Sequence, residues 1–191
     1  MQPFSGRLLI GATGSAAVAS LPMYINALRS AFTGSVTVLM TYTAATFIPP
    51  HTMGLFADRV VTGTEPDRWP RENQASLAAE HDMMAVLPAT ANILSVVATG
   101  AVPNMLSATI MAAEFPVVFF PVMTGEMWRK PAVRRNVEQL REDGYQVIDP
   151  APGQRYDVGF GTVIESPMPP TPPEFIQAVG KLMPRHGTEA V

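Results

Sequence analysis

Short apolar runs alternate along the chain with segments that have the spacing of helices. The apolar runs cover residues 7–12, 35–41, 83–87, 117–120 and 145–148. Strands that read as continuous apolar runs between helices are typical of a parallel sheet with both faces covered. The pattern therefore predicts a three-layer α/β fold, a Rossmann-like (flavodoxin-like) parallel sheet with helices on both sides.

The helices are indicated by apolar residues three or four positions apart. Leu21, Ile25 and Leu28 share one face of a segment that follows the turn Thr13-Gly14-Ser15. Pro131 and Gly144 mark the start and the end of the clearest helix. The other helices are expected over residues 75–80, over 92–111 with a break near Pro103, over 174–182, and on both sides of Pro49-Pro50 within 44–60.

Proline and glycine dominate the chain after Asp149, up to the last predicted helix. Such a segment cannot form a core of its own, so it is either a flexible flap or a linker to that helix. We expect one domain over residues 1–191, with a substrate flap at about 151–170. Residues 62–73, which are polar and contain two prolines, are expected to form an exposed loop.

Composition narrows the possible classes of protein. Of 191 residues, 47% are hydrophobic and 15% are charged, which excludes a disordered chain and suggests that sister subunits cover part of the surface. A net charge of −3 lacks the basic excess of nucleic-acid-binding proteins. The chain has no cysteine, which excludes disulfides, thiolate metal sites and a cysteine nucleophile and suits a reducing cytoplasm. No apolar stretch reaches the length of a membrane span.

Hydroxyl-bearing residues follow three of the predicted strands. The turn Gly11-Ala12-Thr13-Gly14-Ser15 lies between the first strand and the first helix, Thr41 and Thr43 follow the second strand, and Thr90 and Asn92 follow a third. The carboxyl ends of parallel strands meet at the edge where open α/β sheets bind ligands, and helix N-termini favour phosphate there. The pattern predicts one phosphate-bearing ligand, although helix capping alone would explain each residue singly.

Other candidate groups are less informative. His51, His81 and His186 have no metal-ligand spacing, and no serine-hydrolase motif is present, so we interpret the histidines as surface or packing residues and predict no metal. Four basic residues near the start of the clearest helix favour a solvated face over an anion site. They are Arg129, Lys130, Arg134 and Arg135.

Two segments are much more specific. The sequences PATAN at 88–92 and PVMTGEMW at 121–128 resemble the PASANT and PxMNxxMW motifs of the homo-oligomeric flavin-containing cysteine decarboxylases. The second is followed, as in that family, by Pro131, a helix and Asp149-Pro150. The resemblance covers roughly residues 7–150 and includes Gly100 and the stretch NMLS at 104–107.

The resemblance implies FMN as cofactor and three candidate branches of the family. Met127-Trp128 argues against the flavin prenyltransferases. Phosphopantothenoylcysteine decarboxylases generally use a flap cysteine, which this chain lacks, so the peptidyl-cysteine decarboxylases of lantibiotic biosynthesis are favoured. Their reaction oxidises the C-terminal cysteine of a ribosomally made precursor peptide and releases CO₂. The product is an enethiol that can form an aminovinyl-cysteine ring.

The resemblance also implies site residues and partners. A trimer, often assembled into a dodecamer, would hold flavin at its subunit interfaces, and the flap would close over the peptide. Ser107 and Met123 would lie near the flavin ring. The residues implied to bind FMN elsewhere are Gly14, Ser15, Ala16, Thr41, Thr43, Thr90, Ala91 and Asn92.

At two positions the sequence departs from the family. Its active-site histidine lies fourteen residues before the proline of PASANT, where an ungapped count places Gln74. Thr124 replaces the asparagine of the second motif. A glutamine cannot exchange a proton as histidine does, although it can orient a substrate by hydrogen bonds. The chain is therefore a divergent enzyme with Gln74 and Thr124 in the catalytic positions, or an inactive flavin-binding subunit that recruits the peptide. A shifted alignment would instead bring His51 or His81 into the site.

Overall fold

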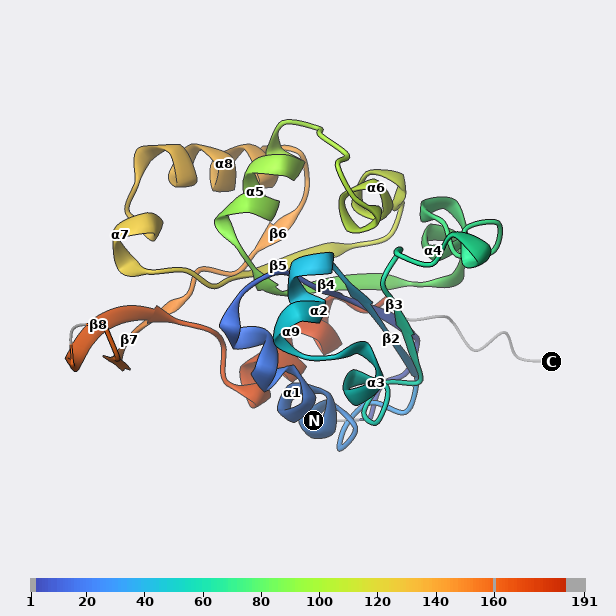
Figure 1. Ribbon diagram of the computed structural model, residues 1–191, viewed down its shortest axis with the longest axis horizontal. Coiled ribbons are helices and arrows are strands. Elements are labelled where there is room, and N and C mark those ends of the chain that lie inside the picture. Colours follow the sequence, from blue (N-terminus) through green and yellow to red (C-terminus); the bar gives the residue numbers. More distant parts are fainter. Residues whose placement is uncertain (1–2, 160, 185–191) are drawn as a thin grey trace.

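The computed structural model describes residues 3–159 and 161–184, and its centre is a twisted parallel sheet (Figure 1). Its strands pair in the order β3-β2-β1-β4-β5-β6. This is the Rossmann order, in which the direction of winding reverses between β1 and β4. The predicted three-layer fold is confirmed. The six strands are β1 (Arg7–Ala12), β2 (Ser35–Met40), β3 (Arg59–Val61), β4 (Met83–Ala89), β5 (Val117–Pro121) and β6 (Gln146–Val147).

Helices cover both faces of the sheet (Figure 1). One face carries the 3-10 helix η1 (Ala16–Ser20) and the helices α1 (Leu21–Leu28), α2 (Tyr42–Phe47), α3 (Pro50–Met53) and α9 (Pro172–Leu182). The other carries α4 (Gln74–Glu80), α5 (Ala91–Ala98), α6 (Met105–Ala112) and α8 (Pro131–Glu142). The short helix α7 (Gly125–Trp128) follows β5, and η2 (Pro66–Arg68) lies in the loop before α4. Within the described residues, no helix is both long and apolar enough to cross a membrane.

The alternation of side chains along each strand divides the core into two clusters. Leu8 and Ile10 of β1 face α1 and α9, whereas Leu9 between them faces the helices on the opposite side. All three side chains are fully buried. A strand that is apolar at every position therefore supplies both layers, which is why the strands read as continuous apolar runs.

Two predicted elements differ in the structure, and one predicted break is confirmed. The first predicted helix is divided into η1 and α1, because Pro22 favours the first turn of a new helix. The break expected near Pro103 is confirmed, since Gly100 follows α5 with a φ of 68° and α6 begins at Met105. The strand β3 overlaps the end of the segment 44–60, where the sequence predicts a second helix after Pro49-Pro50. It has only three residues, too few to show an alternating pattern.

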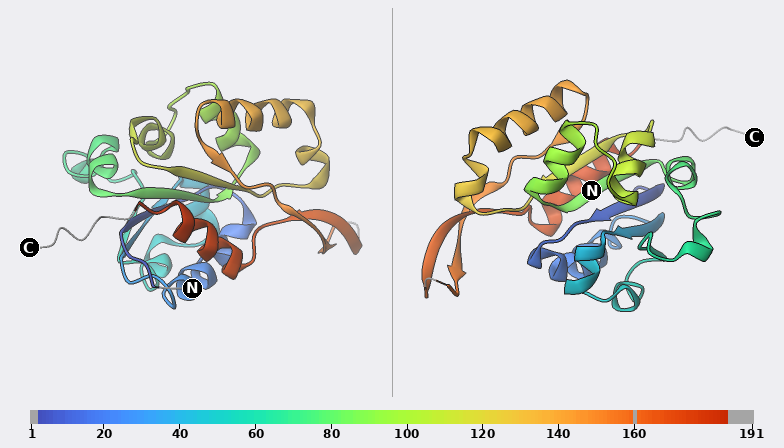
Figure 2. Two further views of the ribbon diagram at one scale, coloured as in Figure 1. Left: turned by 180° about the vertical axis from the view of Figure 1, so that it is seen from behind. Right: turned by 45° about the horizontal axis from the view of Figure 1, so that its top comes forward.

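The proline-rich segment after residue 150 forms an antiparallel hairpin of β7 (Ala151–Asp157) and β8 (Thr162–Met168). The hairpin projects from the sheet beside α7, as all views show (Figures 1 and 2). At its base Pro167 lies against Gly125, where an added Cβ would come within 3.5 Å of the Pro167 Cδ atom. The hairpin is therefore attached next to the end of β5, on the side of the molecule where the parallel strands end.

Candidate active site

Threonines occupy the ends of the three central strands. Thr13 follows β1, Thr41 follows β2 and Thr90 follows β4. The predicted convergence of hydroxyl groups at the carboxyl edge is therefore present, and it lies beside the point where the winding of the sheet reverses. Open α/β folds bind their ligands at this point.

Thr13 connects two of these strand ends. Its buried hydroxyl donates a hydrogen bond to the Pro88 carbonyl oxygen at 2.6 Å and accepts one from the Thr90 backbone N–H at 3.2 Å. The loop after β1 and the end of β4 are thereby held at a fixed separation. The PATAN segment is thus part of a preformed edge.

A hollow of about 360 Å³ opens at this edge. Its volume lies within the usual range of ligand pockets, roughly 300–1,000 Å³. Its lining residues carry hydroxyl, amide, phenol or apolar groups and no Asp, Glu, Lys, Arg or His. They are Thr13, Gly14, Thr41, Tyr42, Thr43, Thr90, Asn92, Ile93 and Asn104.

Helix capping accounts for only part of this polar lining. Thr41 and Thr90 cap α2 and α5 by accepting hydrogen bonds from the backbone N–H groups of Ala44 and Ile93. Thr43 and Asn92 are exposed, and neither side chain has a hydrogen-bond partner in the described part of the chain. These two side chains are available to a ligand, which capping alone would not require.

Gly14 allows the turn after β1 to approach α2 closely. A Cβ atom at position 14 would lie 2.5 Å from the Cγ2 atom of Thr43, well inside van der Waals contact. Gly14 therefore lets the Thr43 side chain lie where the Cβ atom of any other residue would be. Both residues line the hollow.

The remaining residues implied to bind the cofactor do not line the hollow of one chain. Ser15 caps η1, Ala16 is its first residue, and Ala91 is the first residue of α5. Ser107 is fully buried, and its hydroxyl donates to the Asn104 carbonyl oxygen at 3.0 Å. Met123 packs half-buried against the core on the α5 side of the sheet.

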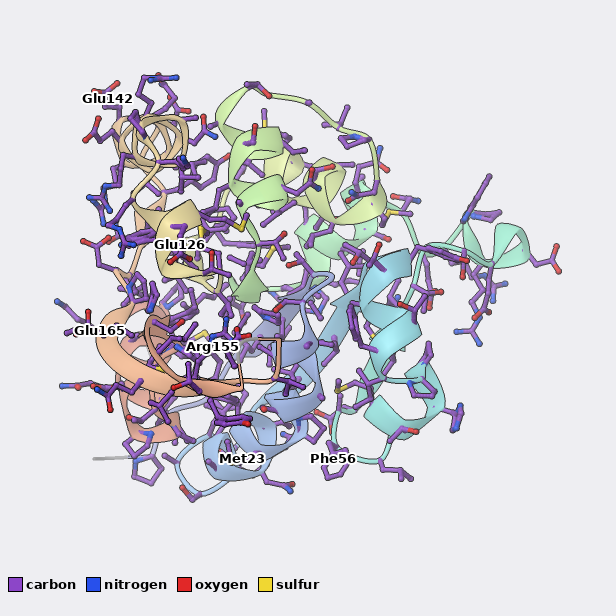
Figure 3. The ribbon with its side chains drawn as sticks, turned by 60° about the vertical axis from the view of Figure 1, so that its left-hand side comes forward. Met23, Phe56, Glu126, Glu142, Arg155 and Glu165 are labelled. Carbon is purple, nitrogen blue, oxygen red and sulfur yellow. The ribbon has the colours of Figure 1, made fainter. Side chains whose placement is uncertain are left out.

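Thr124 lies at the N-cap of α7. Its hydroxyl accepts from the Met127 N–H at 3.4 Å. The pKa of the neighbouring Glu126 carboxyl is lowered, first by its own backbone N–H and then by a hydrogen bond from Thr124. The charge of Arg155, on β7, lowers this pKa slightly further. Figure 3 shows Glu126 and Arg155 on these neighbouring elements.

A groove of about 490 Å³ separates α7 from the hairpin. Trp128 and Arg129 form its wall on the α7 side, and Gln154, Glu165 and Ser166 belong to the hairpin wall. Arg155 is fixed beside it by an ion pair with Asp157 at 2.8 Å. The groove is open and partly polar, as a binding site for an extended peptide would be.

Gln74 lies far from Thr124. Gln74 is the first residue of α4, and its side chain is exposed. The helices α4 and α7 lie at opposite ends of the molecule in Figure 1 and in both views of Figure 2. One chain therefore does not bring its two predicted catalytic residues together.

The histidines do not replace the missing family histidine within one chain. His81 precedes β4 and therefore lies at the amino edge of the sheet, opposite the hollow. It is buried, its Nδ1 atom lies 2.8 Å from the Leu77 carbonyl oxygen, and burial lowers its pKa. His51 lies on α3, which contacts β3 and does not line the hollow. His186 lies outside the described residues.

The four basic residues near α8 form no common site. Arg134 stacks on Trp128, with its Cζ atom 4.8 Å from the ring centroid. Arg129 pairs with Glu126 at 3.7 Å. Lys130 and Arg135 are exposed. This arrangement agrees with the solvated face that the sequence favoured.

Four residues of the hollow are absent from the predicted cofactor-binding residues: Thr13, Tyr42, Ile93 and Asn104. Thr13 belongs to the turn that was predicted to favour a phosphate, and Tyr42 lies between Thr41 and Thr43, so both positions carried a signal. Asn104 begins the NMLS stretch and caps α6 by accepting from the Ser107 N–H at 3.0 Å. The position of Asn104 in the NMLS stretch that resembles the family, at the start of a helix, was the signal that could have identified it.

Comparison with known proteins identifies the family. The model of the family described as Flavoprotein matches residues 4–166. The chain belongs to this flavoprotein family. It is 36% identical over 156 residues to the mersacidin decarboxylase of Bacillus sp. strain HIL-Y85/54728. This match covers 82% of this chain and 79% of that protein. It is also 38% identical over 121 residues to the coenzyme A biosynthesis bifunctional protein CoaBC of Bacillus subtilis, covering 62% of this chain and 30% of that protein.

Solved structures of cysteine decarboxylases share the fold. EpiD complexed with the substrate peptide DSYTC has a TM-score of 0.82 and 25% identity, covering 94% of this chain and 99% of that one. The FMN-dependent cysteine decarboxylase SpaF has a TM-score of 0.74 and 32% identity. The match covers 92% of this chain and 94% of the SpaF chain. The resemblance found from the two motifs is thereby confirmed.

The hollow fits a flavin nucleotide. Gly14 has no side chain to shield the backbone at the lining of the hollow, and Thr43 and Asn92, which cap no helix, supply neutral donors. The helices α5 and α6, each of eight residues, begin at this edge and favour a negative group there. No carboxylate lines the hollow to repel a phosphate.

Proposed function

We propose that this protein is an FMN-dependent enzyme that oxidatively decarboxylates the C-terminal cysteine of a ribosomally made precursor peptide. The observation that carries the proposal is the neutral hollow at the switch point of the sheet, built from the PATAN segment, in a chain similar to mersacidin decarboxylase. The product is a peptidyl enethiol, the precursor of an aminovinyl-cysteine ring.

The residues of the hollow would hold FMN. Gly14 with Ser15 and Ala16, and Thr43 with Thr41, lie on two sides of it, and Thr90, Ala91 and Asn92 on a third. Ser107 would act through Asn104, and Met123 would lie toward the ring from the end of β5. When bound, FMN accepts the hydride removed from the cysteine side chain.

The chain itself would orient the peptide. The cysteine loses a hydride from its Cβ atom and a proton from sulfur, which gives a thioaldehyde. A carboxylate β to a thiocarbonyl then leaves as CO₂, and the enethiol remains. Thr124, at the N-cap of α7, would donate a hydrogen bond to that carboxylate. The hairpin would serve as the flap over the peptide, within a single domain.

The site would be completed by a second copy of the chain. Gln74 and Thr124 lie at opposite ends of one molecule, so a site that uses both takes them from different subunits. A homo-oligomer, as a trimer or as a dodecamer assembled from trimers, would also cover exposed apolar side chains such as Leu55 and Val102. The absence of cysteine agrees with a cytoplasmic location.

Mass spectrometry tests the proposal. FMN-loaded protein is incubated with a pool of C-terminal-cysteine peptides, the same peptides ending in serine, and phosphopantothenoylcysteine. We expect only cysteine peptides to lose CO₂ and two hydrogens. If FMN stays bound and every cysteine peptide remains unchanged, including the native precursor, the proposal is wrong.

Two observations favour alternatives that this experiment separates. The similarity to CoaBC supports phosphopantothenoylcysteine as substrate, although the hairpin has no cysteine. Gln74 and Thr124 in the family's catalytic positions support an inactive flavin-binding subunit that recruits the precursor peptide. Turnover of the small substrate alone would establish the first, and peptide binding without turnover the second.

A further inference from the structure

Tyr42 is a large aromatic residue at an unusually open position. It is the first residue of α2, and 75% of it is exposed. It also lines the hollow at the carboxyl edge. Exposed aromatic surface next to a pocket is commonly covered when a ligand binds.

The position of Tyr42 is fixed by its neighbours. Thr41 caps α2 by accepting from the Ala44 N–H at 3.3 Å. Ala44 and Ile48 anchor the helix in the core, and α2 also contacts η1. Because the backbone is held, the ring remains at the rim of the hollow, where only a bound molecule or another chain can cover it.

The other lining residues offer no comparable group. They are small or polar, apart from Ile93, so Tyr42 supplies the one aromatic ring among them. Aromatic rings favour offset stacking with a planar conjugated system. Threonine hydroxyls and an asparagine amide can bind the phosphate and the ribityl chain of a flavin nucleotide, but they provide no such surface for its ring.

We propose that the phenol ring of Tyr42 lies against the isoalloxazine ring of the bound flavin, an inference that rests on the proposed use of this hollow for FMN. Tyr42 thereby contributes to flavin affinity and sets the optical properties of the bound flavin. A phenol in contact with a photoexcited flavin transfers an electron to it, and the electron returns to the phenol without net reaction. The emission of the flavin is therefore quenched, which a phenylalanine ring does not do.

Three variants test this contact. Tyr42→Phe keeps the ring and removes the electron donor, whereas Tyr42→Leu removes both. Phe47→Leu is the matched control, because Phe47 lies on the same helix, is 50% exposed and does not line the hollow. Each apoprotein is titrated with FMN, flavin emission and its lifetime are recorded, and the oligomeric mass is measured by sedimentation.

We expect Tyr42→Phe to bind FMN within about twofold of the wild type while emission of the bound flavin rises severalfold. Tyr42→Leu should show the same rise and roughly three- to tenfold weaker binding, as the loss of an aromatic pair predicts. The Phe47→Leu protein should match the wild type in both measurements.

The inference is wrong if both Tyr42 variants keep the emission and the FMN affinity of the wild type. It is also wrong if Tyr42→Leu changes only the oligomeric mass, which would place Tyr42 in a subunit contact. These readouts need no peptide, so they separate the inference from the proposed reaction. If the wild-type protein binds no FMN, both proposals fail together.

Discussion

The hydroxyl of Thr13 and the carbonyl oxygen of Pro88 lie 2.6 Å apart in a hydrogen bond that joins the loop after β1 to the end of β4. These two elements flank the point where the winding of the sheet reverses. The bond is buried and spans 75 residues of sequence. It therefore fixes the width of the edge at which the hollow opens.

Replacement of Thr13 by Val should loosen this edge. The change preserves the shape of the side chain but leaves the Pro88 carbonyl oxygen and the Thr90 N–H without their buried partner. We expect a loss of about 1–3 kcal/mol in the free energy of unfolding, measured by urea denaturation. FMN affinity should fall as well. Thr13→Ser retains the hydroxyl and should lose less than half as much stability, and equal losses in the two variants would contradict this role.

Gly14→Ala should close part of the hollow. The new Cβ atom would lie 2.5 Å from the Thr43 Cγ2 atom, so α2 or the turn must move. Overpacking of this kind typically costs about 1–3 kcal/mol of stability. We expect weaker FMN binding in equilibrium titrations. Gly54→Ala is the control, since its nearest contact would be an ordinary 3.4 Å and its φ of −64° suits alanine. Unchanged FMN binding in Gly14→Ala would show that the close packing of Gly14 against Thr43 does not shape the flavin site.

The sequence predicted the parts of the fold that depend on local pattern. Continuous apolar strands and the threonines at their ends placed Gly14, Thr41 and Thr90 at one edge, and the structure confirms this convergence. Local pattern did not reveal β3, because its three residues gain their strand geometry from pairing with β2. The link from Thr13 to Pro88 also depends on residues distant in sequence, so no local pattern could show it.

Gln74 and Thr124 offer a test of the two catalytic positions. Gln74→His introduces a group that can exchange protons near neutral pH, and Thr124→Asn introduces a side chain with an amide donor. If the protein is an active divergent enzyme, each change should alter its rate of peptide decarboxylation by less than about tenfold. If it is a recruiting subunit, only the double variant should produce decarboxylated peptide, measured by mass spectrometry. Because Gln74 is exposed, Gln74→Ala serves as a control for stability.

His81 should make stability depend on pH. The side chain is buried at the end of α4, and burial lowers its pKa below the ordinary value of 6.5, against the raising effects of the Leu77 carbonyl and of Glu80. The charges of Arg59 and Arg7 lower it further. The unfolded chain therefore binds a proton more readily than the folded protein as the pH falls through about 6.5.

The contribution of His81 is thus fully present above that pH and is lost as the pH falls toward the folded pKa. The loss should approach, at most, about 1.4 kcal/mol per pH unit. Urea denaturation between pH 7.5 and 5 should show a shallower decline for His81→Gln than for the wild type, because glutamine does not titrate. Equal slopes in the wild type and His81→Gln would exclude His81 as the source, since the two proteins differ in no other titrating group.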